Sequence, residues 1–326
     1  MYHVLVIGGA GYIGSHMLLA LQQKGIQVTV LDNLSNGHAD AVLYGDLVVG
    51  DVADTVLLDQ IFTQNTIDAV LHFASFIQVG ESVTDPAKYY VNNVSNTIGL
   101  LNAMQRHGVK NLVFSSTAAT FGEPQYNPID ERHPQHPINP YGRSKWMVEQ
   151  LLQDYEQAYG LHSVCLRYFN AAGAHPEGLV GERHEPETHL IPLILQAASG
   201  KRSHITVFGR DYDTPDGTCI RDYIHVMDLV QAHVQALEFL DKEHTSANFN
   251  LGNGEGFSVQ QVLDVARAVT GKDFVVQEGA RRAGDPARLV ASSALARKVL
   301  GWQPQYPDLR TIVEHAWAWE CKTLVK

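Results

Sequence analysis

The chain has 326 residues, 45% of them hydrophobic, which is enough to bury a large core in one α/β unit or in two domains. Lys and Arg number 24 against 35 Asp and Glu, so the formal net charge of -11 argues against a nucleic-acid partner, whose phosphates need a basic surface. Because the three cysteines are scattered, no secretion signal is present and no apolar run reaches roughly 18 residues, we expect a cytoplasmic protein without a membrane partner.

The first half of the chain alternates short apolar runs with longer helical patterns. The runs predict strands over residues 3–8, 27–32, 67–74, 110–116 and 162–169, nearly continuous in apolar residues as in a sheet covered on both faces. Between them, residues 11–25, 86–108 and 140–160 have a helical period, and each segment ends in a glycine. This alternation predicts an α/β fold with a doubly wound parallel sheet of the Rossmann type.

After about residue 171 the pattern becomes irregular. Residues 171–189 are rich in Gly, Pro, His and Glu without a period, which indicates a functional loop. Further on, the sequence predicts helices at 189–199, from Met227 and near 310–322, a strand at 204–209, and a strand-loop-helix unit at 248–271. We expect residues 1–170 to form the sheet domain and residues 171–326 a smaller mixed α/β lobe over its carboxyl edge. This boundary is approximate because the chain can cross back.

The sequence GGAGYIGSH carries the first functional signal. It holds Gly8, Gly11 and Gly14 between an apolar run and a helix, where glycines allow a tight turn and a close approach to a pyrophosphate. Asp32 ends the second predicted strand, and an acid there bonds a ribose 2′-hydroxyl and disfavours a 2′-phosphate, which selects NAD over NADP. Asp51 and Phe73-Ala74-Ser75 follow later strands at this edge, where ligands bind, although core packing is the preferred explanation of Phe73 and Ala74 when they are taken alone.

The stretch NPYGRSKW places Tyr141 and Lys145 four residues apart, on one face of a predicted helix. A nearby ammonium and a positive nicotinamide favour the phenolate of a tyrosine, whose unperturbed pKa is ~10. Ser115, Ser116 and Thr117 end the preceding strand, and we expect their hydroxyls to be exposed at the same sheet edge. The three elements predict a base that takes a proton from a sugar or alcohol hydroxyl while hydride moves to NAD, with Thr117 bonded to the same oxygen. The Tyr-Lys spacing alone also fits a solvated helix surface.

Taken together, the motifs are recognisable. GGAGYIGSH, LDNLSNG, YYVNNVSNT, FSSTAATFG, NPYGRSKWMVEQ, LRYFNAAGAHP and IRDYIHVMDL resemble the extended short-chain dehydrogenase/reductase family from residue 2 to about 320, and most closely its nucleotide-sugar epimerase branch. The resemblance implies reversible 4-epimerisation of UDP-glucose and UDP-galactose, by transient hydride transfer to tightly bound NAD through a 4-keto sugar. It leaves UDP-N-acetylhexosamines open as substrates, and it implies a homodimer joined through helices 85–107 and 141–159.

The resemblance also implies roles for individual residues. Tyr141 is expected to be the base, Lys145 its electrostatic partner and a ribose ligand, and Thr117 the hydroxyl helper where the family usually has serine. The implied cofactor contacts are Gly8, Gly11, Tyr12, Ile13, Gly14, Asp32, Asn33, Leu34, Ser35, Asn36, Gly37, Asp51, Val52, Phe73, Ala74, Ser75, Asn92, Thr117, Tyr141, Lys145 and Phe169. The implied substrate contacts are Thr117, Tyr141, Asn170, His189, Leu190, Phe208, Arg221, Arg282, Asp285 and Leu289.

Three positions bear on how closely the family pattern is followed. Ile77 stands where some epimerases have a lysine that reaches the cofactor, and Thr188-His189 replace a paired asparagine, which leaves the backbone of Leu190 as the safer contact. Leu289 occupies the position that gates sugar bulk, where tyrosine crowds an N-acetyl group and small residues admit it. Leucine is intermediate between the two.

Other functions are considered beside this one. A nucleotide-sugar 4,6-dehydratase of the same fold needs an Asp-Glu pair after Thr117, where this chain has Ala118-Ala119. A dehydrogenase that exchanges NAD with solution and an inactive NAD-binding regulatory protein are further alternatives, and the latter would not need a proton acceptor. We expect no metal site, because His133, His136, His184 and His189 are predicted to be surface residues without the cysteine or carboxylate geometry of a zinc site.

Overall fold

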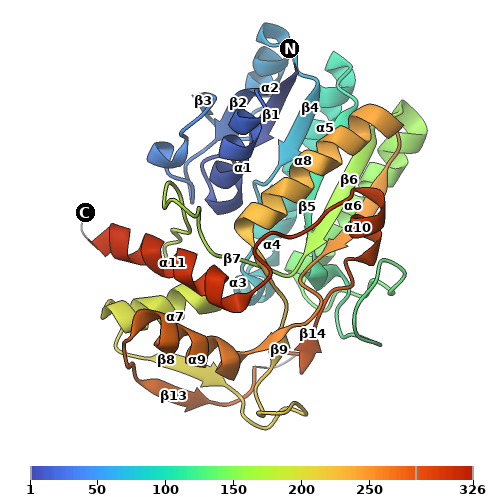
Figure 1. The fold of residues 1–326 in the computed structure, drawn as a ribbon. Coiled ribbons are helices and arrows are strands. Elements are labelled where there is room, and N and C mark those ends of the chain that lie inside the picture. Colours follow the sequence, from blue (N-terminus) through green and yellow to red (C-terminus); the bar gives the residue numbers. More distant parts are fainter. Residues whose placement is uncertain (1, 283–284, 325–326) are drawn as a thin grey trace.

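The computed structural model describes residues 2–282 and 285–324, and Figure 1 shows a large sheet with helices on both sides above a smaller lobe. The sheet has seven strands in the order β11-β6-β5-β4-β1-β2-β3, and each neighbouring pair is parallel. The strands are β1 (His3–Ile7), β2 (Gln27–Asp32), β3 (Asp46–Val49), β4 (Ala69–His72), β5 (Asn111–Thr117), β6 (His162–Tyr168) and β11 (Ala247–Leu251). The predicted doubly wound parallel sheet is confirmed.

Two apolar cores hold the helices to the two faces of the sheet. Successive side chains of a strand point to opposite faces, so Val4 and Val6 of β1 join one core while Leu5 and Ile7 join the other. The first core includes α1 (Tyr12–Gln23) and α8 (Val226–Glu243); the second includes α2 (Thr55–Gln64), α5 (Asn96–His107) and α6 (Pro140–Tyr159). The near-continuous apolar strands follow from burial on both faces.

The smaller lobe has a core of its own, in which Ile194, Leu263 and Ile312 are completely buried. These residues lie on α7 (Leu190–Ser199), α9 (Val259–Thr270) and α11 (Leu309–Leu324). Three small sheets complete the lobe: β7 (Asn170–Ala172) with β10 (Tyr223–His225), β8 (Ile205–Phe208) with β13 (Val276–Gly279), and β9 (Ile220–Arg221) between β12 (Phe257–Ser258) and β14 (Arg288–Leu289).

The chain crosses back from the lobe to the large sheet. After β10 it forms α8, which covers the sheet, and then β11, which pairs with β6 in parallel from Ala247 opposite Val164 to Leu251 opposite Tyr168. The short helix α10 (Ala294–Val299) returns to the same core through buried Ala296. A single cut at residue 170 therefore does not separate the sheet from the lobe.

Segment boundaries differ from prediction in a few places. The predicted helix 86–108 consists of α4 (Pro86–Tyr90), a π-helical turn over Val91–Ser95 and α5, and such turns often occur at functional sites. The helix α3 (Val79–Thr84) and the strand β3 were not predicted. Within the described part of the chain, none of the helices has the length and apolar character needed to span a bilayer.

Candidate functional site

The candidate site begins where β1 and β4, the two strands at which the strand order reverses, end side by side. Gly8 follows β1 with φ +82°, and a Cβ there would lie 2.6 Å from the backbone nitrogen of Ala74. A Cβ on Gly14 would lie 2.1 Å from the Gly8 oxygen, so only glycine lets α1 pack this closely on the loop. The N–H groups of Tyr12, Ile13 and Gly14 form the first turn of α1 and have no partner within the helix, which suits an anionic phosphate.

The carboxylate of Asp32 organises the next loop at this edge. Its Oδ2 accepts a hydrogen bond from Ala10 N at 2.9 Å and its Oδ1 accepts one from Leu34 N at 2.8 Å. Asn33 donates to Asp51 Oδ2 at 2.7 Å, which connects the ends of β2 and β3. Each carboxylate oxygen keeps a second lone pair for a ribose hydroxyl, so the donor and acceptor set of the loop fits the adenosine half of NAD. The other predicted cofactor residues nearby are the exposed Ser35 and Asn36, together with Gly37 and the buried Val52.

After β4, backbone hydrogen bonds fix the residues that the sequence assigned to the cofactor. The N–H groups of Phe73 and Ala74 both donate to Ile7 O, at 2.8 and 3.2 Å, and Ser75 follows them. Asn93, which the sequence did not single out, lies in the π-helical turn beside Asn92 and holds this loop: it bonds the backbone N and O of Phe76, each at 3.0 Å. Its amide also donates to Ser144 Oγ on α6 at 3.1 Å. Ile77 is 38% exposed.

Thr117 and Tyr141 meet at the carboxyl end of β5. Asn139 caps α6 by accepting a hydrogen bond from Gly142 N at 2.8 Å, which starts the helix at Pro140 and puts Tyr141 in its first turn. A Cβ on Gly142 would lie 2.3 Å from Ala119 O, so the helix touches the turn that follows Thr117. Burial raises the pKa of Tyr141, and a side-chain hydrogen bond with Thr117 opposes this shift. The predicted hydroxyl helper and the predicted base are thus in contact.

Lys145 is 4% exposed, and its ammonium donates to Ser115 O at 2.8 Å. Burial lowers its pKa to about 7, although the Glu149 carboxylate acts in the opposite direction. The expected shift of Tyr141 toward phenolate is therefore not produced by the side chains of the protein, because burial raises the pKa of Tyr141. A bound nicotinamide, which the glycine loop implies, would add positive charge that favours the phenolate.

The expectation that the Ser115 and Ser116 hydroxyls are exposed at the sheet edge is wrong. Both residues are at most 3% exposed: Ser115 Oγ bonds His233 at 3.2 Å, and Ser116 Oγ donates to Glu149 at 2.5 Å. Glu149 is also paired with Arg167 of β6 through contacts of 2.9 and 2.6 Å, both side chains being buried. Sequence reasoning did not identify this pair, which fixes α6 to the sheet one turn beyond Lys145.

Most of the predicted substrate residues gather in the lobe around β9 and β14. The register of these two strands puts Leu289 opposite Arg221, and the Arg221 guanidinium pairs with Asp285. The Arg282 guanidinium stacks at 4.1 Å on the ring of Phe208, a side chain that is 36% exposed. The predicted residues Phe169 and Asn170 connect this region to the end of β6: Phe169 packs on the same small apolar cluster as Leu289, and Asn170 donates to Asp222 O at 3.0 Å.

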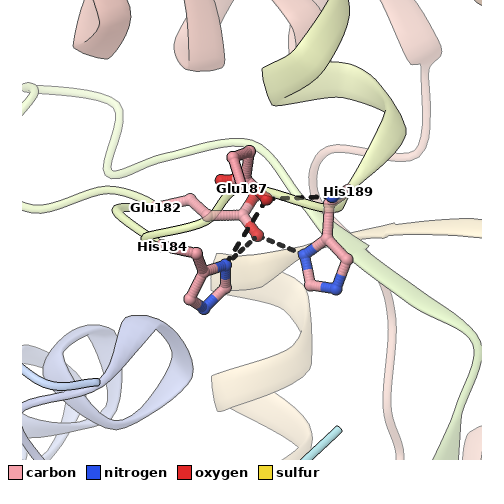
Figure 2. Close-up of side chains that lie close together, drawn as sticks. All are labelled: Glu182, His184, Glu187 and His189. Atoms are coloured by element: carbon pink, nitrogen blue, oxygen red, sulfur yellow. Dashed lines mark hydrogen bonds and ion pairs between the residues drawn. The ribbon is translucent and has the colours of Figure 1, made fainter. Parts of the chain in front are cut away.

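His189 and Leu190 stand at the start of α7, where His189 is the N-cap residue. There His189 belongs to a group of four side chains that Figure 2 shows converging on one point. We call Glu182, His184, Glu187 and His189 the 182–189 cluster.

Hydrogen bonds and opposite charges hold the 182–189 cluster together. Glu182 accepts from the Nδ1 atoms of both histidines, and Glu187 lies 3.6 Å from His184 Nδ1. Burial alone would lower the pKa of His184, but its bonds to the two carboxylates raise it to about 10. The expectation that His184 and His189 lack carboxylate partners is therefore wrong. His133, expected at the surface, is also buried, whereas His136 is exposed.

Segment 171–189 is attached to the glycine loop. The Tyr12 hydroxyl donates to Gly173 O at 2.7 Å, and the Tyr12 ring meets the His184 ring edge-on at a centroid distance of 6.4 Å. Arg183 pairs with Asp40, beyond the predicted cofactor loop. The irregular segment therefore bridges the phosphate-binding turn and α7.

Comparison with known proteins agrees with this geometry. Residues 4–252 match the NAD dependent epimerase/dehydratase family. The chain is 56% identical over 316 residues to UDP-glucose 4-epimerase of Halalkalibacterium halodurans, covering 97% of this chain and 95% of that protein. It superimposes on UDP-glucose 4-epimerase from Brucella ovis in complex with NAD with a TM-score of 0.96, at 49% identity and 98% coverage of each chain. The UDP-Glc/GlcNAc 4-epimerase of Campylobacter jejuni is similar at a TM-score of 0.87, with 43% identity over 99% of this chain and 100% of that one.

Proposed function

This chain belongs to the NAD dependent epimerase/dehydratase family, and we propose that it interconverts UDP-glucose and UDP-galactose by inverting C4 of the hexose. The observation that carries the proposal is the contact between Thr117 and Tyr141 at the end of β5, in the same sheet edge as the glycine loop. A hydroxyl and a phenol in this position suit the removal and return of a proton on a sugar oxygen.

The residues that would hold NAD follow from the geometry of the strand ends. The first turn of α1 offers backbone N–H groups to the pyrophosphate, and Asp32 offers carboxylate oxygens to a ribose. The Lys145 ammonium lies one turn of α6 after Tyr141 and donates to Ser115 O. Its charge and position suit a hydrogen bond to a hydroxyl of the second ribose of NAD. When bound, NAD accepts hydride from C4 of the sugar and returns it.

Tyr141 would take the proton from the C4 hydroxyl as hydride leaves and give it back after the 4-keto sugar has turned its other face. Thr117 would hydrogen-bond the same oxygen and hold it near the phenol. On the substrate side, Arg221 and Arg282 supply positive charge for a diphosphate, and an arginine fork is well suited to such oxyanions. Arg221 is already held by Asp285 and by Pro286 O at 2.9 Å, so it is positioned before any ligand arrives.

The alternative functions are less well supported by the side chains present. Ala118 and Ala119 form the short helical turn directly after Thr117 and carry no group that could donate or accept a proton, whereas elimination of water needs an acid and a base. A regulatory NAD-binding protein has no use for a buried phenol in contact with Thr117.

The proposal is tested with purified protein and UDP-galactose, the UDP-glucose formed being oxidised by a coupled dehydrogenase. We expect continued conversion of UDP-galactose, because the coupled oxidation removes UDP-glucose, without net consumption of enzyme-bound NAD. Tyr141→Phe should keep its NAD and lower kcat by orders of magnitude, while Tyr155→Phe, the same change further along α6, should leave kcat near that of the wild type. Protein that carries NAD but leaves UDP-galactose unchanged would contradict the proposal.

We also propose a homodimer in the cytoplasm. Exposed apolar side chains of the π-helical turn and of α6, namely Val91 (57% exposed) and Met147 (37%), support an interface through the helices expected from the sequence. The three cysteines are unpaired, as in a reducing compartment. Light scattering coupled to gel filtration should give twice the chain mass, and Val91→Glu should shift it toward the monomer; a monomeric wild type would contradict the interface.

A further inference from the structure

Four potential metal ligands come from one eight-residue segment. The 182–189 cluster has the spacing Glu-x-His-x-x-Glu-x-His, and each residue offers one ligand atom. These atoms all lie within 4.8 Å of one another. Figure 2 shows the two imidazole rings facing the two carboxylates from either side, with the Nδ1 atoms directed inward. One small ion could therefore reach all four groups.

Two of the separations between ligand atoms bracket the value for a four-coordinate site. Tetrahedral zinc with bonds of about 2.0–2.1 Å to nitrogen and oxygen requires ligand atoms about 3.3 Å apart. His184 Nδ1 lies 3.1 Å from Glu182 and 3.6 Å from Glu187, on either side of that value. His189 Nδ1 is in direct hydrogen-bond contact with Glu182, so these two atoms would have to separate slightly to admit an ion.

Burial and charge favour a cation at this point. The side chains of Glu182 and Glu187 are only 5% and 4% exposed, and two carboxylates so close together require about two positive charges nearby. The two imidazolium groups supply this charge without a metal, and one divalent ion would supply the same charge once both rings have lost their extra protons. Two imidazole nitrogens among four ligands favour Zn²⁺, Co²⁺ or Ni²⁺ and disfavour Mg²⁺ and Ca²⁺, which prefer all-oxygen ligands.

The backbone around the cluster is already fixed. Glu187 Oε1, the oxygen that lies 3.6 Å from His184 Nδ1, also accepts from Thr188 N at 2.7 Å and from His189 N at 2.9 Å, which fixes this carboxylate in place. The carbonyl of Glu182 accepts from Trp319 Nε1 of α11 at 3.0 Å. A segment held at these points loses little further entropy when it binds an ion.

We propose that the 182–189 cluster binds one divalent d-block cation of the Zn²⁺ class in a closed, structural site. Four protein ligands leave no open position for a substrate, as in structural rather than catalytic zinc sites. The ion would cross-link the segment between the start of α7 and the ring of Tyr12 in the phosphate-binding turn. Binding of the ion would add a metal requirement to the stability of the lobe.

The test uses untagged, NAD-loaded protein that has been dialysed against dipicolinate and then titrated with Co²⁺. We expect one equivalent of Co²⁺ per chain, the visible absorption of four-coordinate Co²⁺, displacement by Zn²⁺, and a rise in Tm with Zn²⁺. His184→Gln and Glu187→Gln should each weaken Co²⁺ binding by more than about 100-fold, since even outer-shell changes cost 10–100-fold. His136→Gln, a change at an exposed histidine outside the cluster, should bind Co²⁺ like the wild type.

Two results would overturn the proposal. The first is a wild-type protein that takes up no stoichiometric Co²⁺, which would make the cluster an imidazolium–carboxylate network only. The second is equal Co²⁺ binding by the wild type and by folded His184→Gln protein, with folding checked by circular dichroism and NAD content. The titration of the wild type decides the first case even if both variants fail to fold.

Discussion

The position of Tyr141 depends on the closest approach in the site, between Gly142 and the turn after Thr117. Replacing Gly142 by Ala adds a Cβ that would lie 2.3 Å from Ala119 O. Contacts of this kind are not found below 3.0 Å, so the start of α6 and the turn must move apart by at least 0.7 Å, the difference between these two values. The same movement separates the Tyr141 phenol from the Thr117 hydroxyl, because the two residues flank the contact.

The size of the effect follows from this displacement. A shift of about 1 Å in a reacting group costs roughly 10²-fold in rate, so we expect kcat of Gly142→Ala to fall about 30- to 100-fold. Overpacking of this kind costs about 1–3 kcal/mol in the free energy of unfolding. The glycine loop is untouched, and bound NAD should remain near one equivalent.

The assay compares kcat, KM and NAD content of Gly142→Ala with those of Gly99→Ala. Gly99 lies in α5, and a Cβ there meets only Thr55 Cγ2 at the ordinary distance of 3.7 Å. That variant should keep wild-type kcat and gain up to about 1 kcal/mol from its better helix propensity. A Gly142→Ala enzyme with wild-type kcat would refute the idea that this contact positions Tyr141.

Three further predictions concern stability and specificity. Arg167→Met leaves the Glu149 carboxylate buried without its partner, so the free energy of unfolding in urea should fall by about 3–5 kcal/mol. The double variant Arg167→Met/Glu149→Gln should recover part of this loss, because no unpaired charge remains buried. Burial, aided by the charge of Lys145, lowers the pKa of His72 to about 3, so the unfolded chain binds one more proton below pH 6.5. The free energy of unfolding therefore decreases as the pH falls from 6.5. Between pH 6.5 and 4.5, the free energy of unfolding of His72→Gln should decrease by about 2–3 kcal/mol less than that of the wild type. Equal decreases would contradict this prediction. Leu289→Tyr should lower kcat/KM for UDP-N-acetylgalactosamine at least tenfold relative to UDP-galactose, and an unchanged ratio would remove Leu289 from the gate.

Local sequence patterns were sufficient to predict the large sheet because its strands and helices alternate with a clear period. The runs at 3–8, 27–32 and 162–169 match β1, β2 and β6 within a residue at each end. β3 escaped detection because Asp46–Val49 has only four residues, which are half-buried or exposed at the sheet edge. The partner of β11 could not be predicted either, since its pairing with β6 joins residues about 80 positions apart and no local pattern encodes that choice.

The phosphate-binding turn was predictable for the same reason, because Gly8, Gly11 and Gly14 form a local pattern between an apolar strand and a helix, although the space at Gly8 is limited by the distant Ala74. The 182–189 cluster was not, although its four residues lie close in sequence. The Glu-x-His-x-x-Glu-x-His spacing has no helical or strand period. Contacts of Arg183, Glu182 and His184 with other elements of the fold hold the segment in the conformation that brings the four side chains together. The partners in those contacts are Asp40, Trp319 and Tyr12, all far from the segment in the sequence.

Tyr141 and Lys145 illustrate how burial changes an argument made from spacing. Four residues apart on a helix, a phenol and an ammonium suggest a phenolate, because in water the cation would favour the anion. In the folded chain both groups are buried, and desolvation disfavours each charged form: the pKa of Tyr141 rises while that of Lys145 falls to about 7. Burial therefore works against the phenolate in the protein alone, and a further positive charge would favour it. A nicotinamide ring brings that charge only in its oxidised form, so the basicity of Tyr141 would be coupled to the redox state in which a proton must be removed from the sugar.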